Sequence, residues 1–488
     1  MKAIIIGAGI GGIATSIRLA KKGYKVDVYE QNSYPGGKLS VFEQDGFRFD
    51  AGPSLFTLPE FVDDLVKLQD EDSNIDFPYK KLDESCRYFW EDGKRITAYT
   101  DPEKFGAEVE KIFGVPAKTI IDYIKDAEFK YEKSARIFLE KSLHKTSTFL
   151  SKEILPALLN IYKFGLFQSM NEVNQRKLKD PKLVQLFNRF ATYNGSDPYQ
   201  APGILTSIAN LELNKGTFYP KAGMYQITST LVEVAESLGV RFNYNAGVEK
   251  IRVEKKEATG VLVEGKFIPA NLVVSNMDIY PTYKKLLSEE KQPETILNQE
   301  RSSSALIFYW GIDRTFDELG LHNIFFSKDY QNEFQHIFNK QSVAPDPTVY
   351  VNITSKHTPE DAPKGMENWF VMVNVPANNG QDWDKLIPEV KESVLKKLTR
   401  ELSVDISQHI ITEDILEPRT IESKTSSYQG ALYGSSSNNR YAAFLRHPNF
   451  HQKIKNLYFS GGSVHPGGGI PLCLLSAKII DDLSPSVK

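Results

Sequence analysis

The chain has 488 residues, too many for one ordinary hydrophobic core, so we expect two or three intertwined domains. Its formal net charge of −3 excludes the basic footprint of a nucleic-acid-binding protein. Its two cysteines, Cys86 and Cys473, argue against a disulfide framework and for a reducing, cytosolic compartment. Its eight histidines form no metal-like cluster with cysteine. No apolar stretch approaches the ~18 residues that a membrane-spanning helix needs.

The first thirty residues predict a dinucleotide-binding unit. Residues 3–6 form an apolar run typical of a buried parallel strand, and apolar residues follow with helical spacing over 13–20. Between them, Gly7 permits a tight turn, Gly9 admits a pyrophosphate and Gly12 lets the helix pack close to the strand. A second strand over 24–29 ends at Glu30. Its distance from the glycines is that at which dinucleotide-binding folds place the acidic residue that binds the ribose hydroxyls. The alternative, a signal peptide, lacks a convincing cleavage site and leaves the second strand unexplained.

A second glycine turn favours FAD over a nicotinamide cofactor. Gly36-Gly37-Lys38 returns the chain to the end of the second strand. In a flavoprotein of this build, such a pair of glycines and a base would lie beside the pyrophosphate, whereas nicotinamide domains do not require them. The alternative is a simple loop with a solvated Lys38. Asp45-Gly46 then predicts a hairpin turn, and Thr57-x-x-Glu60 predicts a helix that begins with a capping box.

Residues 118–213 read as mostly helical. Within them, residues 149–167 are rich in leucine, isoleucine and aromatic residues, with lysines scattered among them. Such a segment is typical of a membrane interface, with apolar side chains at the acyl boundary and lysines at the head groups. The alternative is a buried pair of helices with a solvated lysine face, which the segment taken alone favours.

The chain then returns to the nucleotide domain and continues into a further domain. A helix is predicted over 227–238, with strands over 240–244, 248–253 and 272–274. The strand near Val248 would offer backbone groups to an adenine. Strand-like pieces over 305–310, 348–353 and 369–375, with a helix over 387–402, predict a substrate domain. Because their alternation is poor, we expect a sheet with two covered faces.

A third glycine loop precedes the last helix. A strand near 456–459 runs into Gly461-Gly462, and the loop ends at Gly469-Ile470 before a helix over 472–483. Five glycines in nine residues indicate backbone that lies against something flat or anionic. The helix dipole would stabilise negative charge on a reduced flavin. The alternative is a structural turn.

Together these motifs carry a family likeness over essentially the whole chain. The unit from Gly7 to Glu30, the glycine pair 36–37 and the segments 46–54, 193–195 and 465–471 resemble the bacterial carotenoid desaturases, the phytoene desaturase family of FAD-containing, amine-oxidase-like proteins. Lys38 stands where phytoene desaturases usually have arginine. With the segments 52–60 and 444–448, it makes the chain more similar to the hydroxycarotenoid 3,4-desaturase branch. The turn at 461–463 lacks the acidic residue of many FAD oxidases, so its cofactor contacts would come from backbone or hydroxyl groups.

The resemblance implies an α/β (α+β) fold with a Rossmann-like FAD-binding domain of the glutathione-reductase/amine-oxidase type, a mixed-sheet substrate domain and a helical cap. We expect the FAD domain in three parts, 1–117, 214–300 and 426–488, with the cap and membrane-associating segment at 118–213 and the substrate domain at 301–425. No metal site is expected. The residues expected to bind FAD are Gly7, Gly9, Gly11, Gly12, Glu30, Gly37, Lys38, Pro53, Val248, Gly461, Gly462, Gly469 and Ile470.

The implied reaction is desaturation of a carotenoid, namely 3,4-desaturation of a 1-hydroxycarotenoid of the hydroxy-γ-carotene type. A polyene has no acidic proton, so the feasible route is hydride loss to flavin N5 followed by loss of a neighbouring proton. His465, beside the third glycine loop, is the first candidate proton acceptor, with a structural role as its alternative; Arg446 and His447 form a second pair. The residues expected to contact the polyene are Tyr193, Phe164, Phe167 and Trp310.

The resemblance also implies partners and a location. Reoxidation would use oxygen or a membrane quinone, and the protein would be cytoplasmic and peripherally associated with the membrane lipid surface that stores the substrate. Rival functions are desaturation of phytoene to lycopene, an FAD amine oxidase, and a non-catalytic prenyl-binding protein like the GDP-dissociation inhibitors. The intact glycines and Glu30 argue against the last, because such proteins have lost cofactor binding.

Overall fold

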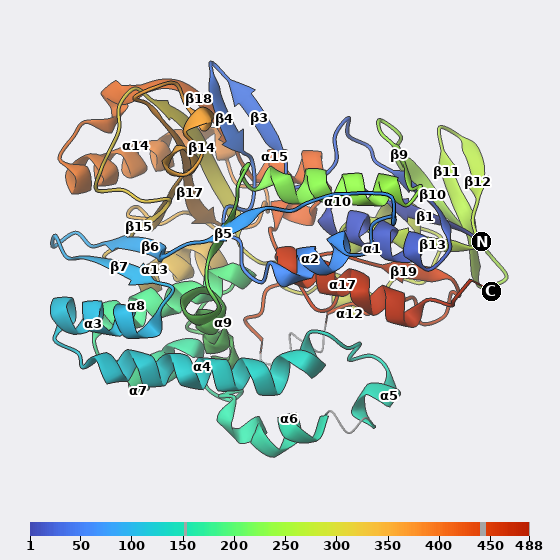
Figure 1. The fold of residues 1–488 in the computed structure, drawn as a ribbon, viewed down its shortest axis with the longest axis horizontal. Helices are drawn as coiled ribbons and strands as arrows, with labels where there is room; N and C mark the ends of the chain where they lie inside the picture. Colours follow the sequence, from blue (N-terminus) through green and yellow to red (C-terminus); the bar gives the residue numbers. More distant parts are fainter. Residues whose placement is uncertain (151–153, 440–445, 488) are drawn as a thin grey trace.

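Two large sheets lie at opposite ends of the molecule, with helices beside and beneath them (Figure 1). The computed structural model describes residues 1–150, 154–439 and 446–487. Of the segment 444–448 that supported the branch assignment, residues 444 and 445 therefore lie outside the described residues. Within the described part of the chain, no helix is both long and apolar enough to cross a membrane.

The first sheet is the predicted nucleotide-binding sheet, with five strands that pair in parallel. In spatial order they are β19 (Leu457–Phe459), β13 (Leu272–Ser275), β1 (Lys2–Ile6), β2 (Lys25–Tyr29) and β9 (Arg241–Asn243). Side chains alternate along β1, so Ala3 and Ile5 pack against helices while Ile4 and Ile6 pack against a small antiparallel sheet. The helices are α1 (Ile10–Lys21), α2 (Glu60–Val66), α10 (Tyr225–Ser237) and α17 (Ile470–Leu483), and the small sheet comprises β10 (Val248–Glu254), β11 (Glu257–Val263) and β12 (Lys266–Pro269).

The second sheet is the mixed sheet of the substrate domain, with seven strands. In spatial order they are β18 (Ile410–Leu416), β14 (Ser304–Ile312), β17 (Glu367–Val375), β16 (Val349–Ile353), β15 (His322–Phe325), β6 (Glu84–Phe89) and β7 (Arg95–Tyr99). One face, which includes Phe308 and Trp310, packs against α14 (Trp383–Leu402). The opposite face carries Ile307 and Tyr309 and is covered as well. Two covered faces explain why these strands show so little alternation of apolar and polar residues.

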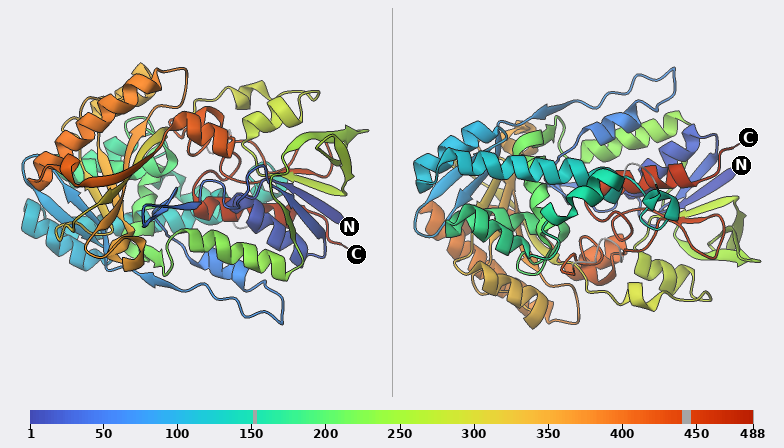
Figure 2. Two further views of the ribbon diagram at one scale, coloured as in Figure 1. Left: turned by 90° about the horizontal axis from the view of Figure 1, so that it is seen from above. Right: turned by 90° about the horizontal axis from the view of Figure 1, so that it is seen from below.

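Helices form the lower edge of the molecule, and the view from below shows them side by side (Figure 2). Local signals set their ends: the Asp101 side chain accepts hydrogen bonds from the amides of Glu103 and Lys104, and Gly114 ends the same helix at a φ of 69°. The helical character expected for 118–213 is present in its described residues. The helices are α3 (Pro102–Phe113), α4 (Ala117–Phe138), α5 (Thr146–Phe149), α6 (Leu155–Asn160), α7 (Met170–Leu178), α8 (Pro181–Asn188) and α9 (Ile208–Asn210).

Two expectations about the N-terminal region need correction. Strands β6 and β7 precede residue 117 but belong to the mixed sheet, where β6 pairs in parallel with β15. That pairing joins segments far apart in sequence, so local patterns do not reveal it. The capping box predicted at Thr57 is also wrong, because α2 begins after Pro59 and no described side chain caps it.

The predicted hairpin at Asp45-Gly46 is confirmed and joins β3 (Val41–Gln44) to β4 (Phe47–Asp50). Both turn residues have positive φ, 50° and 83°, which is the conformation that a tight hairpin turn requires. Shorter elements complete the chain: β5 (Tyr79–Lys81), β8 (Phe218–Pro220), α11 (Ile279–Pro281), α12 (Glu294–Leu297), α13 (Tyr330–Phe334) and α15 (Pro418–Thr425).

Candidate active site

One elongated cavity of about 970 Å³ runs from the carboxyl ends of the parallel strands to the inner face of the mixed sheet. We call the end lined by the three glycine loops (7–12, 36–38 and 461–470) the cofactor half. The end lined by the mixed sheet and by residues 189–212 is the substrate half. All of the predicted FAD-binding residues except Gly12 are among the described residues that line this cavity.

The first glycine loop is closed by Glu30. The Ala8 amide donates to Glu30 Oε2 over 2.7 Å, and the Asn32 amide donates to Oε1 over 2.9 Å. Gly12 does not reach the cavity because it packs against the strand end: a Cβ there would lie 2.2 Å from the Gly7 carbonyl oxygen. This is the close helix–strand approach expected of the third glycine in a dinucleotide fingerprint.

Asn276, which the sequence analysis missed, joins the first and third glycine loops. It follows β13, its backbone amide donates to Ile6 O over 2.8 Å, and its Nδ2 donates to Ser460 O over 3.1 Å. A Cβ on Gly9 or Gly461 would lie 2.6 Å from the Asn276 amide group. The available signal was its position just after an apolar strand, because ligands of open parallel sheets bind at the carboxyl ends of the strands.

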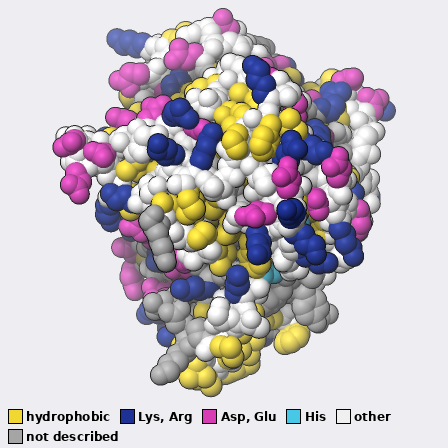
Figure 3. Space-filling model, turned by 90° about the vertical axis from the view of Figure 1, so that its right-hand side faces the viewer, with side chains coloured by type: hydrophobic (Ala, Val, Ile, Leu, Met, Phe, Trp, Pro, Cys, Tyr) yellow, Lys and Arg dark blue, Asp and Glu magenta, His cyan; other side chains and the backbone are white. Residues whose placement is uncertain are grey.

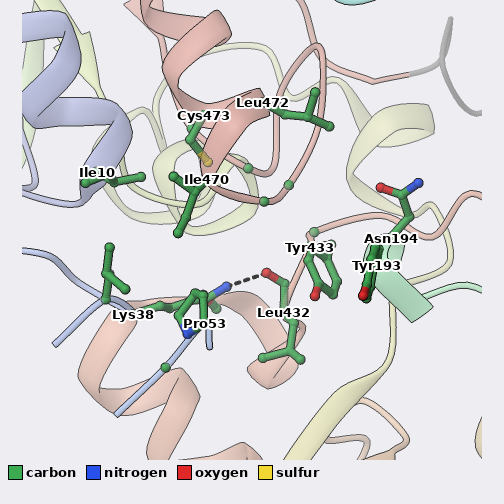
Figure 4. A pocket seen from close by; sticks show the side chains of 18 of the residues that line it. Ile10, Lys38, Pro53, Tyr193, Asn194, Leu432, Tyr433, Ile470, Leu472 and Cys473 are labelled. Carbon is green, nitrogen blue, oxygen red and sulfur yellow. Dashed lines mark hydrogen bonds between the residues drawn. The ribbon is translucent and has the colours of Figure 1, made fainter. Parts of the chain in front are cut away.

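The second glycine loop fastens the cofactor half to a distant segment. Lys38 Nζ donates to the carbonyls of Leu432 and Ala431 over 2.7 and 3.1 Å (Figure 4). Burial lowers the pKa of Lys38 to about 8, an effect that the nearby Asp278 carboxylate opposes. Lys38 is therefore not a solvated loop residue; it orders the wall of the cavity.

These residues fit FAD. Helices α1 and α17 both begin at the cavity, after Gly9 and Gly469, and no described side chain caps either of them. Uncapped amides at a helix N-terminus bind phosphate and stabilise nearby negative charge. In the third loop, a Cβ on Gly468 would lie 2.7 Å from the Tyr433 ring, so glycine keeps that wall narrow. The two helix ends and Glu30 would hold the pyrophosphate, the flavin and the ribose of FAD.

The three candidate proton acceptors have structural contacts instead. His465 Nε2 donates to Lys141 O over 2.8 Å, and burial lowers the His465 pKa to about 4. His447 Nδ1 donates to Pro448 O over 2.7 Å, its Nε2 lies 3.0 Å from Tyr283 Oη, and burial lowers its pKa to about 3. Arg446 donates to the carbonyls of Tyr433, Ser435 and Gly462. None of the three is among the described residues that line the cavity, so the structure gives their catalytic roles no support.

Of the four predicted substrate contacts, Tyr193 lines the cavity and the other three are not among its described lining residues. Phe164 is buried in a small cluster with Ile137 and Leu143, and the Phe167 side chain is 84% exposed. Trp310 points to the opposite face of β14, where its Nε1 donates to Glu413 Oε2 over 2.6 Å. Successive side chains of a strand alternate between faces, so the cavity receives Tyr309 in place of Trp310.

The substrate half is apolar over most of its surface but encloses one polar cluster. Ile307, Phe370 and Met372 come from the mixed sheet, and Ile208 and Leu211 lie on the helical side. At the centre of this cluster, Arg189 Nη2 lies 3.1 Å from Glu212 Oε1. Arg189 also donates to two phenols, from Nη2 to Tyr88 Oη over 2.7 Å and from Nη1 to Tyr193 Oη over 2.9 Å. Ser85 Oγ donates to Glu212. The cluster is not evident from the sequence because its members come from β6 and two separate helical turns.

Comparisons with known proteins agree with this geometry. Residues 10–479 match the family model described as flavin containing amine oxidoreductase. The chain is 53% identical to a 1-hydroxycarotenoid 3,4-desaturase from Flavobacterium sp. (strain P99-3), over 99% of both chains. It is 33% identical to a 4,4'-diapolycopene oxygenase from Methylomonas sp, over 99% of this chain and 97% of the relative. Among solved structures, an oxidoreductase from Methanosarcina mazei matches with a TM-score of 0.64 at 15% identity, over 99% of this chain and 100% of that one.

The expected fold, FAD dependence and oxidoreductase class are therefore confirmed. The chain belongs to the flavin-containing amine oxidoreductase family and, within it, to the group of the carotenoid desaturases.

Proposed function

We propose that the protein introduces the double bond between C3 and C4 of a 1-hydroxycarotenoid, with FAD as the oxidant. The observation that carries this proposal is that the glycine loops of the cofactor half and the apolar walls of the substrate half line one continuous cavity. The similarity to the Flavobacterium desaturase, 53% against 33% for the Methylomonas oxygenase, supports the same reaction class.

Desaturation removes a hydride and a proton from neighbouring carbons: the electron pair of the second C–H bond becomes the new double bond, and the proton is released to solvent. FAD, when bound, supplies the hydride acceptor. The apolar walls hold the polyene in place and keep water away from it. After hydride loss the polyene carries a delocalised positive charge, and the rings of Tyr309 and Phe370 on the cavity wall stabilise that charge.

The substrate reaches the cavity from a lipid surface that contacts residues 149–167. In the described part of this segment Leu150, Leu159 and Phe167 are strongly exposed, and Ile161 and Leu166 line the cavity. Hydrophobic side chains gather at the lower edge of the molecule (Figure 3), the edge that α5 and α6 form in Figure 1. This exposure supports the membrane-interface alternative over a buried helix pair. Oxygen or a membrane quinone as the final electron acceptor remains a prediction.

Anaerobic single turnover tests the reaction. FAD-loaded protein is mixed with liposomes that hold either a 1-hydroxy-γ-carotene or phytoene, and the flavin and polyene spectra are followed. We expect the flavin to bleach and the polyene spectrum to shift to the red only with the hydroxylated substrate. Conversion of phytoene would instead support the phytoene desaturase function, and bleaching with neither would overturn the proposal.

Flotation with phosphatidylcholine–phosphatidylglycerol liposomes tests the membrane surface. A variant with Leu150→Ser, Leu159→Ser and Phe167→Ser removes exposed apolar area, so we expect liposome binding to weaken by roughly 100-fold. The matched control carries Phe267→Ser and Ile411→Ser, which are also exposed but lie outside this segment. Equal losses in both variants would contradict the assignment of the surface to residues 149–167.

A further inference from the structure

The wall of the substrate half also carries a histidine, His322, one of whose ring nitrogens has no hydrogen-bond partner among the described residues. His322 is 4% exposed and lines the cavity. Its Nδ1 lies 2.8 Å from Tyr350 Oη and 3.2 Å from Asn352 Nδ2. Its Nε2 is buried and has no hydrogen-bond partner among the described residues. The reaction proposed above makes no use of this group.

The neighbours of Nδ1 determine where the ring hydrogen lies. Asn352 Nδ2 also donates to Leu321 O over 2.9 Å, which fixes the orientation of the Asn352 amide. An amide nitrogen only donates, so His322 Nδ1 is the acceptor and carries no hydrogen. Burial lowers the pKa of His322 to about 3, and the ring is therefore neutral near pH 7. The single ring hydrogen is then on Nε2, which makes Nε2–H a buried donor at the cavity wall.

A second unpartnered donor lines the same cavity. Arg189 Nε is buried without a partner among the described residues, although both of its terminal nitrogens are hydrogen-bonded. Arg189 also lines the cavity, and its charge contributes to the lowered pKa of His322. If a pure hydrocarbon filled the cavity, these two buried donors would stay unpaired, which costs free energy. A ligand with an oxygen atom could accept hydrogen bonds from them.

We propose that His322 Nε2, assisted by Arg189 Nε, donates a hydrogen bond to the 1-hydroxyl oxygen of the carotenoid and so selects hydroxylated substrates. This inference rests on the function proposed above. The hydroxyl carbon is two bonds from C3, so the oxygen lies roughly 4 Å from the bond that is oxidised.

The position of the donor agrees with that short separation. Tyr350 Oη, which contacts His322, also lies 2.7 Å from Ser54 Oγ. Ser54 directly follows Pro53, one of the predicted FAD contacts, and both line the cavity. Holding the oxygen at His322 would therefore place C3 and C4 next to the cofactor half, while the long polyene extends along the apolar walls.

Anaerobic single turnover of the FAD-loaded protein with a matched substrate pair tests the inference. One substrate is a 1-hydroxy-γ-carotene, and the other is the same polyene without the hydroxyl. We expect the wild type to prefer the hydroxylated substrate by roughly 100-fold or more in kcat/KM, because a site built to bind a hydroxyl rejects an analogue that lacks it. His322→Leu should reduce this preference to below roughly fivefold by slowing the hydroxylated substrate alone, and His322→Gln, which keeps an amide donor, should restore part of it.

Controls separate this inference from the proposed function. His336→Leu changes a histidine that is not among the described lining residues, and it should leave the preference unchanged. FAD absorbance checks that each variant is loaded, and His322→Met serves as a second apolar variant. A wild type that converts neither substrate overturns the proposed function. A wild type that converts both equally well, or a loaded His322→Leu variant that keeps the full preference, overturns the role of His322 alone.

Discussion

The cofactor half of the cavity is built mainly from backbone, whereas the substrate half is built from side chains. Gly9 and Gly461 in the cofactor half lie against the Asn276 side chain, and Gly12 beside it lies against the Gly7 carbonyl, so closely that an added Cβ would collide. In the substrate half, apolar side chains of the mixed sheet surround a buried ion pair between Arg189 and Glu212. On the function proposed above, the cofactor would be held by the geometry of the backbone, and the substrate would be selected by the identity of the side chains.

Substitution of Gly12 should strongly weaken FAD binding by the cofactor half. In Gly12→Ala the new Cβ would lie 2.2 Å from the Gly7 carbonyl oxygen, so the first loop must shift. We expect FAD affinity to fall at least about 100-fold, or ~3 kcal/mol, measured by fluorescence titration of the apoprotein. The matched control is Gly106→Ala, where the Cβ would lie 2.9 Å from Ala117 O and away from the described cavity lining. Near-normal FAD affinity in Gly12→Ala would contradict the geometric account of this half.

Removal of the Glu212 carboxylate should destabilise the substrate half. Glu212→Leu leaves the buried Arg189 guanidinium without its carboxylate, so the free energy of unfolding should fall by about 3–5 kcal/mol in urea titrations. The double variant Arg189→Leu/Glu212→Leu removes both charges and should recover most of that loss. A double variant as unstable as Glu212→Leu alone would show that the charges are not coupled in this way.

The adjacent residues Tyr309 and Trp310 of β14 lie on opposite faces of the sheet, so their substitution should have different effects. Tyr309→Leu removes a ring from the cavity wall and should lower kcat/KM roughly tenfold, about 1.4 kcal/mol. Trp310→Phe leaves the cavity intact but leaves Glu413 Oε2 without the indole donor, so the free energy of unfolding should fall by about 1–3 kcal/mol with kcat/KM unchanged. Steady-state kinetics and urea unfolding of both variants check the assignment, and reversed effects would place the wrong face at the cavity.

The last expected effect concerns the pH dependence of stability. The pKa of buried His465 is lowered to about 4, below the value near 6.5 of an unfolded histidine. As the pH falls below about 6.5 the unfolded chain binds a proton that the folded protein does not, so stability is full above that pH and is lost toward pH 4. His465→Gln should therefore lose about 1–2 kcal/mol less than the wild type between pH 7 and pH 5 in urea unfolding. Parallel losses in the two proteins would show that His465 is not held neutral.

The two halves also differ in how well their residues could be predicted from the sequence. The glycine loops, Glu30 and Lys38 were predictable because each loop is a local pattern whose spacing follows from backbone geometry. Trp310 was assigned to the wrong face because every residue of β14 is buried, and a strand with two covered faces gives no sign of which face is which. His322, Arg189 and Glu212 come together only through tertiary contacts, so no spacing in the sequence connects them.

The mass and amount of the product formed per reduced flavin distinguish desaturation from oxygenation. FAD-loaded protein is mixed without oxygen with a 1-hydroxycarotenoid in liposomes, and the extracted polyene is analysed by mass spectrometry. We expect one product molecule per bleached flavin, lighter than the substrate by two hydrogen atoms and carrying its new double bond between C3 and C4. A product that has gained oxygen when air is admitted, with no anaerobic bleaching, would contradict the account and favour oxygenation.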